Sequence, residues 1–233
     1  MTAATITLQP SKLVPMHDGL HDAFGRRIDY LRISLTDVCN LRCVYCMPEE
    51  MQFQPRAELL QDDEVIFIVQ AAARLGVRKV RLTGGEPTVR RHIVELVRRV
   101  KQVPGIQEVA MTTNGVLLTE LAFPLAAAGL DRVNISVDTL DAASFQRITR
   151  WGSLHDVWSG VEAAEAAGLK PIKLNCVVQR GVNDAGIETL AGFAREHGHL
   201  LRFIEYMDVG TCNGWSRERV VPSAQLRDRI AAH

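Results

Sequence analysis

Three cysteines fall within eight residues of the sequence, at Cys39, Cys43 and Cys46, with the spacing C-x3-C-x2-C. Thiolates on one short loop suit an iron–sulfur cluster, but a cluster of four irons needs four ligands, so one iron is left open. An open iron can accept the amino and carboxylate groups of an amino acid such as S-adenosylmethionine. The alternative is a structural zinc ion, which requires four protein ligands in a closed tetrahedron. No fourth Cys or His lies at a close, typical spacing.

The other two cysteines are distant from this motif. We predict that Cys176 is a core residue of a strand and that Cys212 is a loop thiol. An odd number of cysteines, three of them clustered, does not indicate a disulfide framework and is more typical of a metal or redox site in a reducing compartment.

A second motif, Thr83-Gly84-Gly85-Glu86-Pro87, follows the cysteines at the predicted end of another strand. Two glycines there allow a ligand to approach the backbone closely, and Pro87 ends the strand. A Gly-Gly pair alone also marks ordinary turns. Together with the cysteine motif after the preceding strand, it indicates a binding site.

A recurring phrase defines the elements that position these motifs: glycine, an apolar residue, two variable residues and another apolar residue, beginning at Gly76, Gly105, Gly129 and Gly168. Helical segments precede three of these glycines, which suit the left-handed position after a helix. The predicted strands are about Tyr30 to Thr36, Lys79 to Thr83, Glu108 to Thr112, Arg132 to Val137, Ile172 to Val178 and Leu201 to Tyr206.

Regular alternation of strands and helices predicts an α/β fold with a parallel sheet and right-handed crossovers. Because a closed eight-stranded barrel takes about 250 residues, six units predict an incomplete (β/α)6 TIM-like barrel. A doubly wound sheet is the competing architecture.

Several predicted strands alternate apolar and polar residues, whereas buried parallel strands are usually apolar throughout. If helices cover the apolar face, the polar faces meet in a lumen. That lumen would hold Arg32, Lys79, Arg81 and Lys173 against Asp138, and would favour an anionic ligand with phosphates. The alternative is that these strands are half-exposed edges whose cations are simply solvated.

The composition of the chain excludes some classes of function. The 233 residues carry 27 basic and 27 acidic side chains, and this zero net charge argues against general nucleic-acid binding. The stretch from Met1 to Leu20 has no continuous apolar run, so we expect neither a signal peptide nor a membrane span, and a cytoplasmic protein. We expect an arm at residues 1–24 and one core domain at 25–233, ending in a short helix capped by Ser223, and we interpret the sequence as cut short.

In the order and spacing of its motifs, the sequence resembles the radical S-adenosylmethionine (radical SAM) superfamily, and within it the GTP 3′,8-cyclase family of molybdenum cofactor biosynthesis. The resemblance runs from about Gly25 to Trp215. It rests on Asp29 to Asp37, Cys39 to Pro48, Arg81 to Pro87, Thr112 to Gly115, Asn134 to Asp138 and Arg202 to Gly210.

The resemblance implies a role for eleven residues. Cys39, Cys43 and Cys46 would hold a [4Fe-4S] cluster whose fourth iron chelates S-adenosylmethionine. The positions matching the S-adenosylmethionine site are Tyr45, Gly85, Ser136 and Met207. The positions matching contacts to GTP are Arg32, Arg81, Thr112 and Lys173. No catalytic side chain is assigned. An electron donor and a homodimer are further expectations.

The implied activity is radical cyclisation of GTP, a lyase-type reaction in which the adenosyl radical takes the 3′ hydrogen and the sugar carbon then attacks C8. One feature of the family is missing: the second [4Fe-4S] cluster, whose ligands are not found here, since no cysteine follows Cys212. Two alternatives stay open. One is a radical SAM enzyme for another anionic or peptide substrate, and the other is an inactive remnant that binds S-adenosylmethionine or a metal.

Overall fold

A six-stranded parallel sheet organises the chain in the computed structural model, which describes residues 19–209 and 213–232. The strand order is β3-β4-β5-β6-β7-β8. The bounds are β3 Tyr30–Ser34, β4 Lys79–Thr83, β5 Glu108–Thr113, β6 Arg132–Ser136, β7 Lys173–Val178 and β8 Leu200–Glu205. All six predicted strands are confirmed. Because spatial order follows sequence order without reversal, the sheet is barrel-like and the doubly wound alternative is wrong.

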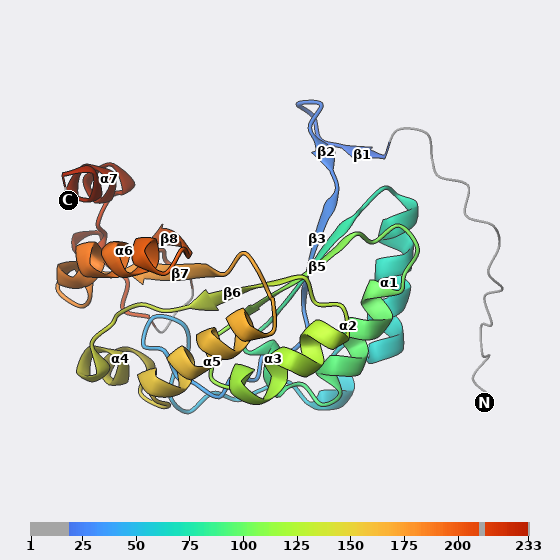
Figure 1. The fold of residues 1–233 in the computed structure, drawn as a ribbon, viewed down its shortest axis with the longest axis horizontal. Coiled ribbons are helices and arrows are strands. Elements are labelled where there is room, and N and C mark those ends of the chain that lie inside the picture. The colour runs from blue at the N-terminus through green and yellow to red at the C-terminus, as the bar shows by residue number, and fades with distance from the viewer. Residues whose placement is uncertain (1–18, 210–212, 233) are drawn as a thin grey trace.

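The helices that connect the strands are α1 Asp62–Arg74, α2 Ile93–Lys101, α3 Leu118–Ala127, α4 Ala142–Thr149, α5 Leu154–Ala166 and α6 Ile187–Glu196, with α7 Ser223–Ala231 after β8. Short 3-10 helices span Arg56–Glu58, Pro87–Val89, Asp184–Gly186 and Arg217–Arg219. Helices α1, α2, α3 and α5 lie along the outer side of the curved sheet (Figure 1). Among the described strands, β3 and β8 are the two edges, so the barrel is open.

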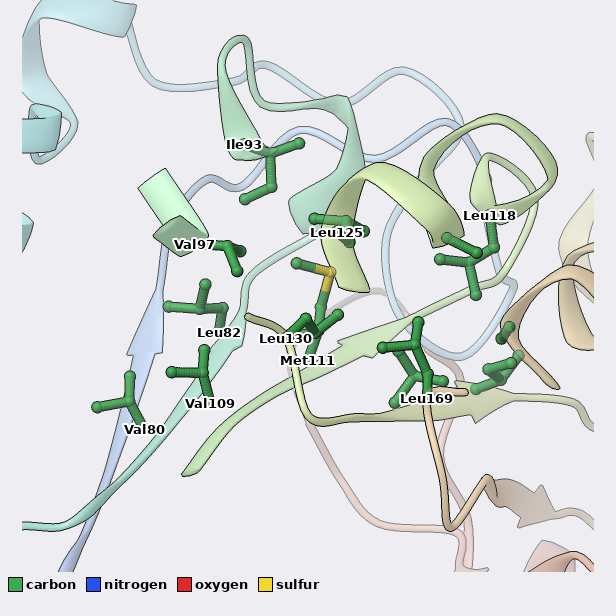
Figure 2. Close-up of a cluster of buried hydrophobic side chains, with 14 of the residues drawn as sticks. Val80, Leu82, Ile93, Val97, Val109, Met111, Leu118, Leu125, Leu130 and Leu169 are labelled. Carbon is green, nitrogen blue, oxygen red and sulfur yellow. The ribbon is translucent and has the colours of Figure 1, made fainter. Parts of the chain in front are cut away.

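The core lies between this sheet and its helices, as the alternating pattern predicts. Val80, Leu82, Val109 and Met111 of β4 and β5 are at most 1% exposed. Figure 2 shows them beside apolar residues of α2 and α3. Burying such side chains stabilises the fold by roughly 1.5–3 kcal/mol each. The apolar face of the strands is therefore fixed toward the helices, and the polar face points inward.

Gly76, Gly129 and Gly168 of the recurring phrase follow the ends of helices as predicted, whereas Gly105 lies four residues after the end of α2. All four have positive φ, between +77° and +97°. After α1, the Gly76 amide donates to the carbonyl of Ala73 and the Val77 amide to that of Ala72, which satisfies carbonyls at the end of the helix.

Both ends of the chain differ in detail from expectation. A two-stranded hairpin of β1 (Leu20–His21) and β2 (Arg27–Ile28) crosses the predicted boundary between arm and core, so that division stays a prediction. Residues 1–18 of the predicted arm, and Cys212, lie outside the described residues. At α7 the prediction of a Ser223 cap is wrong: Pro222 occupies the cap position, and the Ser223 amide donates to the carboxylate of Glu205 instead.

Candidate active site

The three cysteines lie on the loop that leaves the carboxyl end of β3. The amides of Cys46 and Met47 both donate to the carbonyl of Cys43, at 2.9 and 3.2 Å, which folds the second half of the motif into a turn. Cys46 is exposed, whereas Cys39 and Cys43 are partly buried. The Leu41 amide donates to Cys39 Sγ at 3.4 Å. One loop therefore presents three sulfur atoms, one of them open to solvent.

The surroundings of these thiols suit a metal cluster better than three separate thiolates. Burial raises the pKa of Cys39, and burial together with the Asp138 carboxylate raises that of Cys43 still further. Cationic iron would replace these protons, and an N–H donor to sulfur is a feature of iron–sulfur sites. The donor set thus fits a cluster. No group of three or more His, Cys, Asp or Glu side chains in the described part of the chain is placed to hold a single metal ion.

The glycine motif at the end of β4 packs directly against the start of the cysteine loop. The Gly85 amide donates to the Thr36 carbonyl at 2.6 Å, and the Glu86 amide to the Val38 carbonyl at 2.8 Å. A Cβ on Gly85 would lie 2.4 Å from the carbonyl oxygen of Asp37. Glycine is therefore required here by the neighbouring backbone, a cause that the sequence interpretation did not consider. A contact of Gly85 with S-adenosylmethionine stays a prediction.

Glu86 links this motif to the next strand. Its carboxylate is 1% exposed and accepts four hydrogen bonds. Oε1 accepts from the amide and the hydroxyl of Thr88 and from the hydroxyl of Thr113, and Oε2 accepts from the Asn114 amide at 2.6 Å. Asn114 in turn donates to Asn40 beside the first cysteine, at 2.7 Å. The ends of β3, β4 and β5 are thus joined into one unit.

The polar faces of the strands line a cavity of about 790 Å³. Five residues predicted from the resemblance line it together: Arg32, Tyr45, Arg81, Thr112 and Ser136. The sequence prediction of a polar lumen is confirmed for these strands, and the alternative of separate solvated edges is wrong for Arg81, which is only 8% exposed.

Arg81 is the central cation of this cavity. Its guanidinium donates to the Thr112 hydroxyl at 3.2 Å and lies 5.7 Å from the centre of the Tyr30 ring. Its Nε is buried without a hydrogen-bond partner among the described residues. Burial lowers the pKa of Arg81, and the nearby Arg132 and Arg202 lower it further. A buried cation with an unpaired donor favours an anionic partner.

Tyr45 and Asp138 form a buried pair in the cavity wall. The Tyr45 hydroxyl donates to Asp138 Oδ2 at 2.7 Å, and the Val177 amide donates to Oδ1 at 2.8 Å. Burial raises the pKa of Asp138 to about 6 and raises that of Tyr45 as well. The pair fixes the tyrosine that lies between Cys43 and Cys46.

Besides Gly85, three predicted cations or contacts lie outside the cavity lining: Lys79, Lys173 and Met207. Burial lowers the pKa of Lys173, and the nearby charges of Arg132, Arg202 and Arg81 lower it further. Lys79 pairs with Asp29 at 3.4 Å and is half exposed. Met207 is 56% exposed after β8. The prediction that Lys79 faces the lumen is wrong for this cavity, because this lysine pairs with Asp29 instead, whereas the roles of Lys173 and Met207 stay predictions.

Sequence reasoning assigned no role to Tyr30 and Arg202, which also line the cavity. Arg202 belongs to β8, whose apolar residues Leu201, Phe203 and Ile204 surround it. Without strict alternation, that strand gives no signal of which face turns inward. The only available signal is its position within the Arg202-to-Gly210 motif.

Comparison with known proteins assigns the class. Residues 33–194 match the family model described as the radical SAM superfamily, and the chain belongs to this superfamily. A [4Fe-4S] cluster and S-adenosylmethionine are accordingly its cofactors, with Cys39, Cys43 and Cys46 as the residues suited to hold the cluster.

Curated relatives narrow the comparison. The chain is 50% identical over 224 residues to a protein of Acidothermus cellulolyticus named GTP 3′,8-cyclase, covering 94% of this chain and 62% of that protein. It is 49% identical over 214 residues to a protein of the same name from Pelotomaculum thermopropionicum, covering 91% of this chain and 66% of the relative. The chain thus spans slightly less than two thirds of these relatives.

Solved structures share the fold at low sequence identity. Streptococcus suis SuiB, in a crystal structure with bound S-adenosylmethionine, has a TM-score of 0.70 and 20% identity, over 87% of this chain and 47% of that one. Methylornithine synthase (PylB) has a TM-score of 0.68 and 17% identity, over 89% of this chain and 63% of that one. These similarities support the partial barrel.

Proposed function

We propose that the chain provides the radical SAM core of a GTP 3′,8-cyclase, which converts GTP to (8S)-3′,8-cyclo-7,8-dihydroguanosine 5′-triphosphate in molybdopterin biosynthesis. One observation carries this proposal: relatives of that name are 46–50% identical over 91–94% of the chain. Because the chain spans 62–66% of their length, the proposal concerns the part of the enzyme that these residues form.

The cluster side of the site is the loop of Cys39, Cys43 and Cys46. When bound there, a [4Fe-4S] cluster with S-adenosylmethionine supplies a 5′-deoxyadenosyl radical for hydrogen abstraction. The protein's own contribution is to hold the reactants. Tyr45 is fixed by its hydrogen bond to Asp138, and Ser136, the last residue of β6, lies two residues before Asp138 in the chain. We assign Tyr45, Ser136, Gly85 and Met207 to S-adenosylmethionine binding.

The anion side of the site holds the triphosphate. Arg32 and Arg81 are register partners on adjacent strands, so their side chains leave the sheet on the same face. Arg81 has an unpaired buried Nε, and Thr112 beside it carries a hydroxyl. Lys173 adds charge to a region that is already cationic. A polyphosphate is the anion that relieves this repulsion, and guanidinium groups bind phosphate oxygens in a forked geometry.

Positioning is the main catalytic task of such a chain, since the cofactor does the difficult chemistry. Charge-assisted bonds to the phosphates fix the distance between the ribose and the adenosyl group, and the cavity wall limits access of water to the radical. We further propose an external electron donor, a homodimer and a cytoplasmic location. No helix of the described residues is long and apolar enough to cross a membrane.

Anaerobic reconstitution with iron and sulfide, followed by dithionite and S-adenosylmethionine, tests the proposal. The chain is used as it stands. Release of 5′-deoxyadenosine is expected, and its dependence on added GTP is measured. Cys43→Ala should abolish iron binding, whereas Cys176→Ala, which truncates a buried thiol of β7, should retain it.

Substrate identity is tested separately with Arg81→Met. Losing charge-assisted bonds to phosphate should raise the KM for GTP on the order of tenfold or more. Release of 5′-deoxyadenosine with no response to GTP would favour the alternative of another anionic or peptide substrate. Zinc without iron would favour the binding remnant.

A further inference from the structure

The cysteine loop is bound by a turn more than a hundred residues later in the chain. This segment, residues 148–152, comprises the last two residues of α4 and the turn that follows the helix. The Arg42 amide donates to the Thr149 carbonyl at 3.0 Å, and the Val44 amide donates to the Ile148 carbonyl at 2.8 Å. Both amides lie inside the C-x3-C-x2-C motif. The end of α4 therefore fixes the backbone on either side of Cys43.

The side chain of Arg42 closes the loop from within. It is 7% exposed, and its Nη1 donates to the carbonyls of Cys39 and Leu41 at 2.7 and 2.9 Å. Its Nε donates to the carbonyl of Glu49 at 3.1 Å. One guanidinium thus joins the first cysteine to the chain beyond the last. Only an arginine offers planar donors in several directions at this reach.

Two aromatic rings pack against the charged guanidinium of Arg42. The Trp151 ring centre lies 4.2 Å from the Arg42 Cζ, and the Phe53 ring centre lies 5.1 Å away. No ion pair to Arg42 is found among the described residues, so rings and carbonyl oxygens compensate its burial. Burying a guanidinium against backbone carbonyls and rings, without a carboxylate partner, costs free energy. That cost indicates that the conformation of the cysteine loop is important.

The backbone of the turn carries a matching irregularity. Arg150 has φ +60°, in the left-handed region that residues other than glycine rarely occupy. This conformation directs its Nη1 to the carbonyls of Arg42 and Met47, at 3.3 and 3.4 Å. Gly152 has φ +82°, and a Cβ there would lie 2.6 Å from Leu41 Cδ2. Unusual backbone at both residues thus serves the contact with the cysteine loop.

We propose that Arg42 is a positioning residue for the cluster and that residues 148–152 form a clamp that sets the geometry of the three sulfur atoms. The inference rests on the cluster assigned to this chain, and it assigns a role to a residue between the cysteines and to a distant turn. Without the clamp, the loop would sample many conformations, and cluster assembly would have to order it.

The first test uses the apoprotein and needs no cluster. The rate of alkylation of each cysteine by iodoacetamide is followed by peptide mass spectrometry. Arg42→Met and Trp151→Ala should accelerate modification of Cys43 on the order of tenfold, because each removes contacts that keep the loop closed. In Arg42→Lys and Trp151→Phe, the rate of Cys43 alkylation should lie between the rates of these variants and that of the original protein. Cys176, which is buried in β7, reports on global unfolding and should stay slow.

Arg229→Met is the matched control. Its guanidinium also binds a backbone carbonyl, that of Asp184, together with the Glu188 carboxylate, but it does so on α7, away from the loop. This variant should leave Cys43 reactivity within about twofold of the original protein, a difference expected of surface sites. After reconstitution, the Arg42→Met protein should hold less iron, and the midpoint potential of its cluster should shift, because loop geometry and solvent access set that potential.

The outcomes separate this inference from the proposed function. Unchanged Cys43 alkylation in both Arg42→Met and Trp151→Ala overturns the clamp, even if the cluster assembles and cleaves S-adenosylmethionine. If the original chain takes up no iron, the assigned cluster is wrong, whereas the alkylation rates still decide whether the loop is clamped. If Arg42→Met fails to fold, as shown by fast alkylation of Cys176, the Cys43 alkylation rates of Trp151→Ala and Trp151→Phe decide whether the loop is clamped.

Discussion

Replacement of Glu86 by glutamine tests how the motif loops are joined. The carboxylate accepts a backbone N–H on each oxygen, from Thr88 on Oε1 and from Asn114 on Oε2. A glutamine has one carbonyl oxygen and one amide nitrogen, so whichever way it is placed, its NH2 faces one of these N–H groups. One buried donor must then lose its partner, whereas the hydroxyls of Thr88 and Thr113 can rotate and accept.

The size of the effect follows from two opposing contributions. An unpaired buried N–H costs about 1–3 kcal/mol. A second contribution has the opposite sign. Burial raises the pKa of Glu86, which means that the charged carboxylate is less stable in the folded protein than in water, so removing the charge offsets part of this cost. We expect a net destabilisation of about 2 kcal/mol, which lowers the melting temperature by about 4–8 °C for a chain of this length.

Urea unfolding of the apoprotein, followed by circular dichroism, measures this change. Glu95→Gln is the matched control, because Glu95 is exposed on α2 and, among the residues that the structure describes, forms an ion pair with Arg98 alone; its effect should be below about 0.5 kcal/mol. Adding Thr113→Val to each protein completes a double-mutant cycle in which coupling appears only with Glu86. Equal stability of the Glu86→Gln and Glu95→Gln proteins would refute the reasoning.

Two further substitutions follow from the same structure. Gly85→Ala should destabilise the protein by about 3 kcal/mol, because its Cβ would lie 2.4 and 2.5 Å from the carbonyl oxygens of Asp37 and Val38; Gly186→Ala, where no atom lies within 4 Å, is the control in denaturant unfolding. Similar midpoints for the two would contradict the steric argument. Burial lowers the pKa of His199 from 6.5 despite the nearby Glu165, so the unfolded chain binds the proton more readily, and the free energy of unfolding should fall as the pH drops below 6.5. His199→Asn should flatten that part of the pH profile, and a slope that persists would show that another group titrates there.

The fold could be predicted because two periodic signals agree. Val80 and Leu82 alternate with Lys79, Arg81 and Thr83, and this period of two defines both the strand and its inward face. The glycines after the helices set the ends of the connecting segments. Alternating strands and helices then leave few topologies, since crossovers are right-handed and neighbouring strands are usually sequential.

The site was only partly predictable, for a physical reason. Arg81 is predicted from the alternation along its strand and Tyr45 from the family resemblance, and both line the cavity. The contacts that hold the loop are not local: the Arg42 amide donates to the carbonyl of Thr149 at the end of α4, and Tyr45 donates to Asp138, ninety-three residues away. No periodicity links such positions, so only the folded chain identifies Arg42 and Glu86 as organisers of the loops.

The two chemistries of the site are separated along the strands themselves. On β3 and β4, Arg32 and Arg81 are the third residues of their strands, whereas the cysteines and Gly84 follow the strand ends. At about 3.3 Å per residue, Gly84 lies about 10 Å beyond Arg81 along the chain direction. The arginines and the cluster loop are therefore separate regions along the strands, and the cluster loop lies beyond the carboxyl ends. The parallel arrangement of the strands makes this polarity the same for every strand, so the separation of the two regions is a consequence of the topology and does not depend on any one contact.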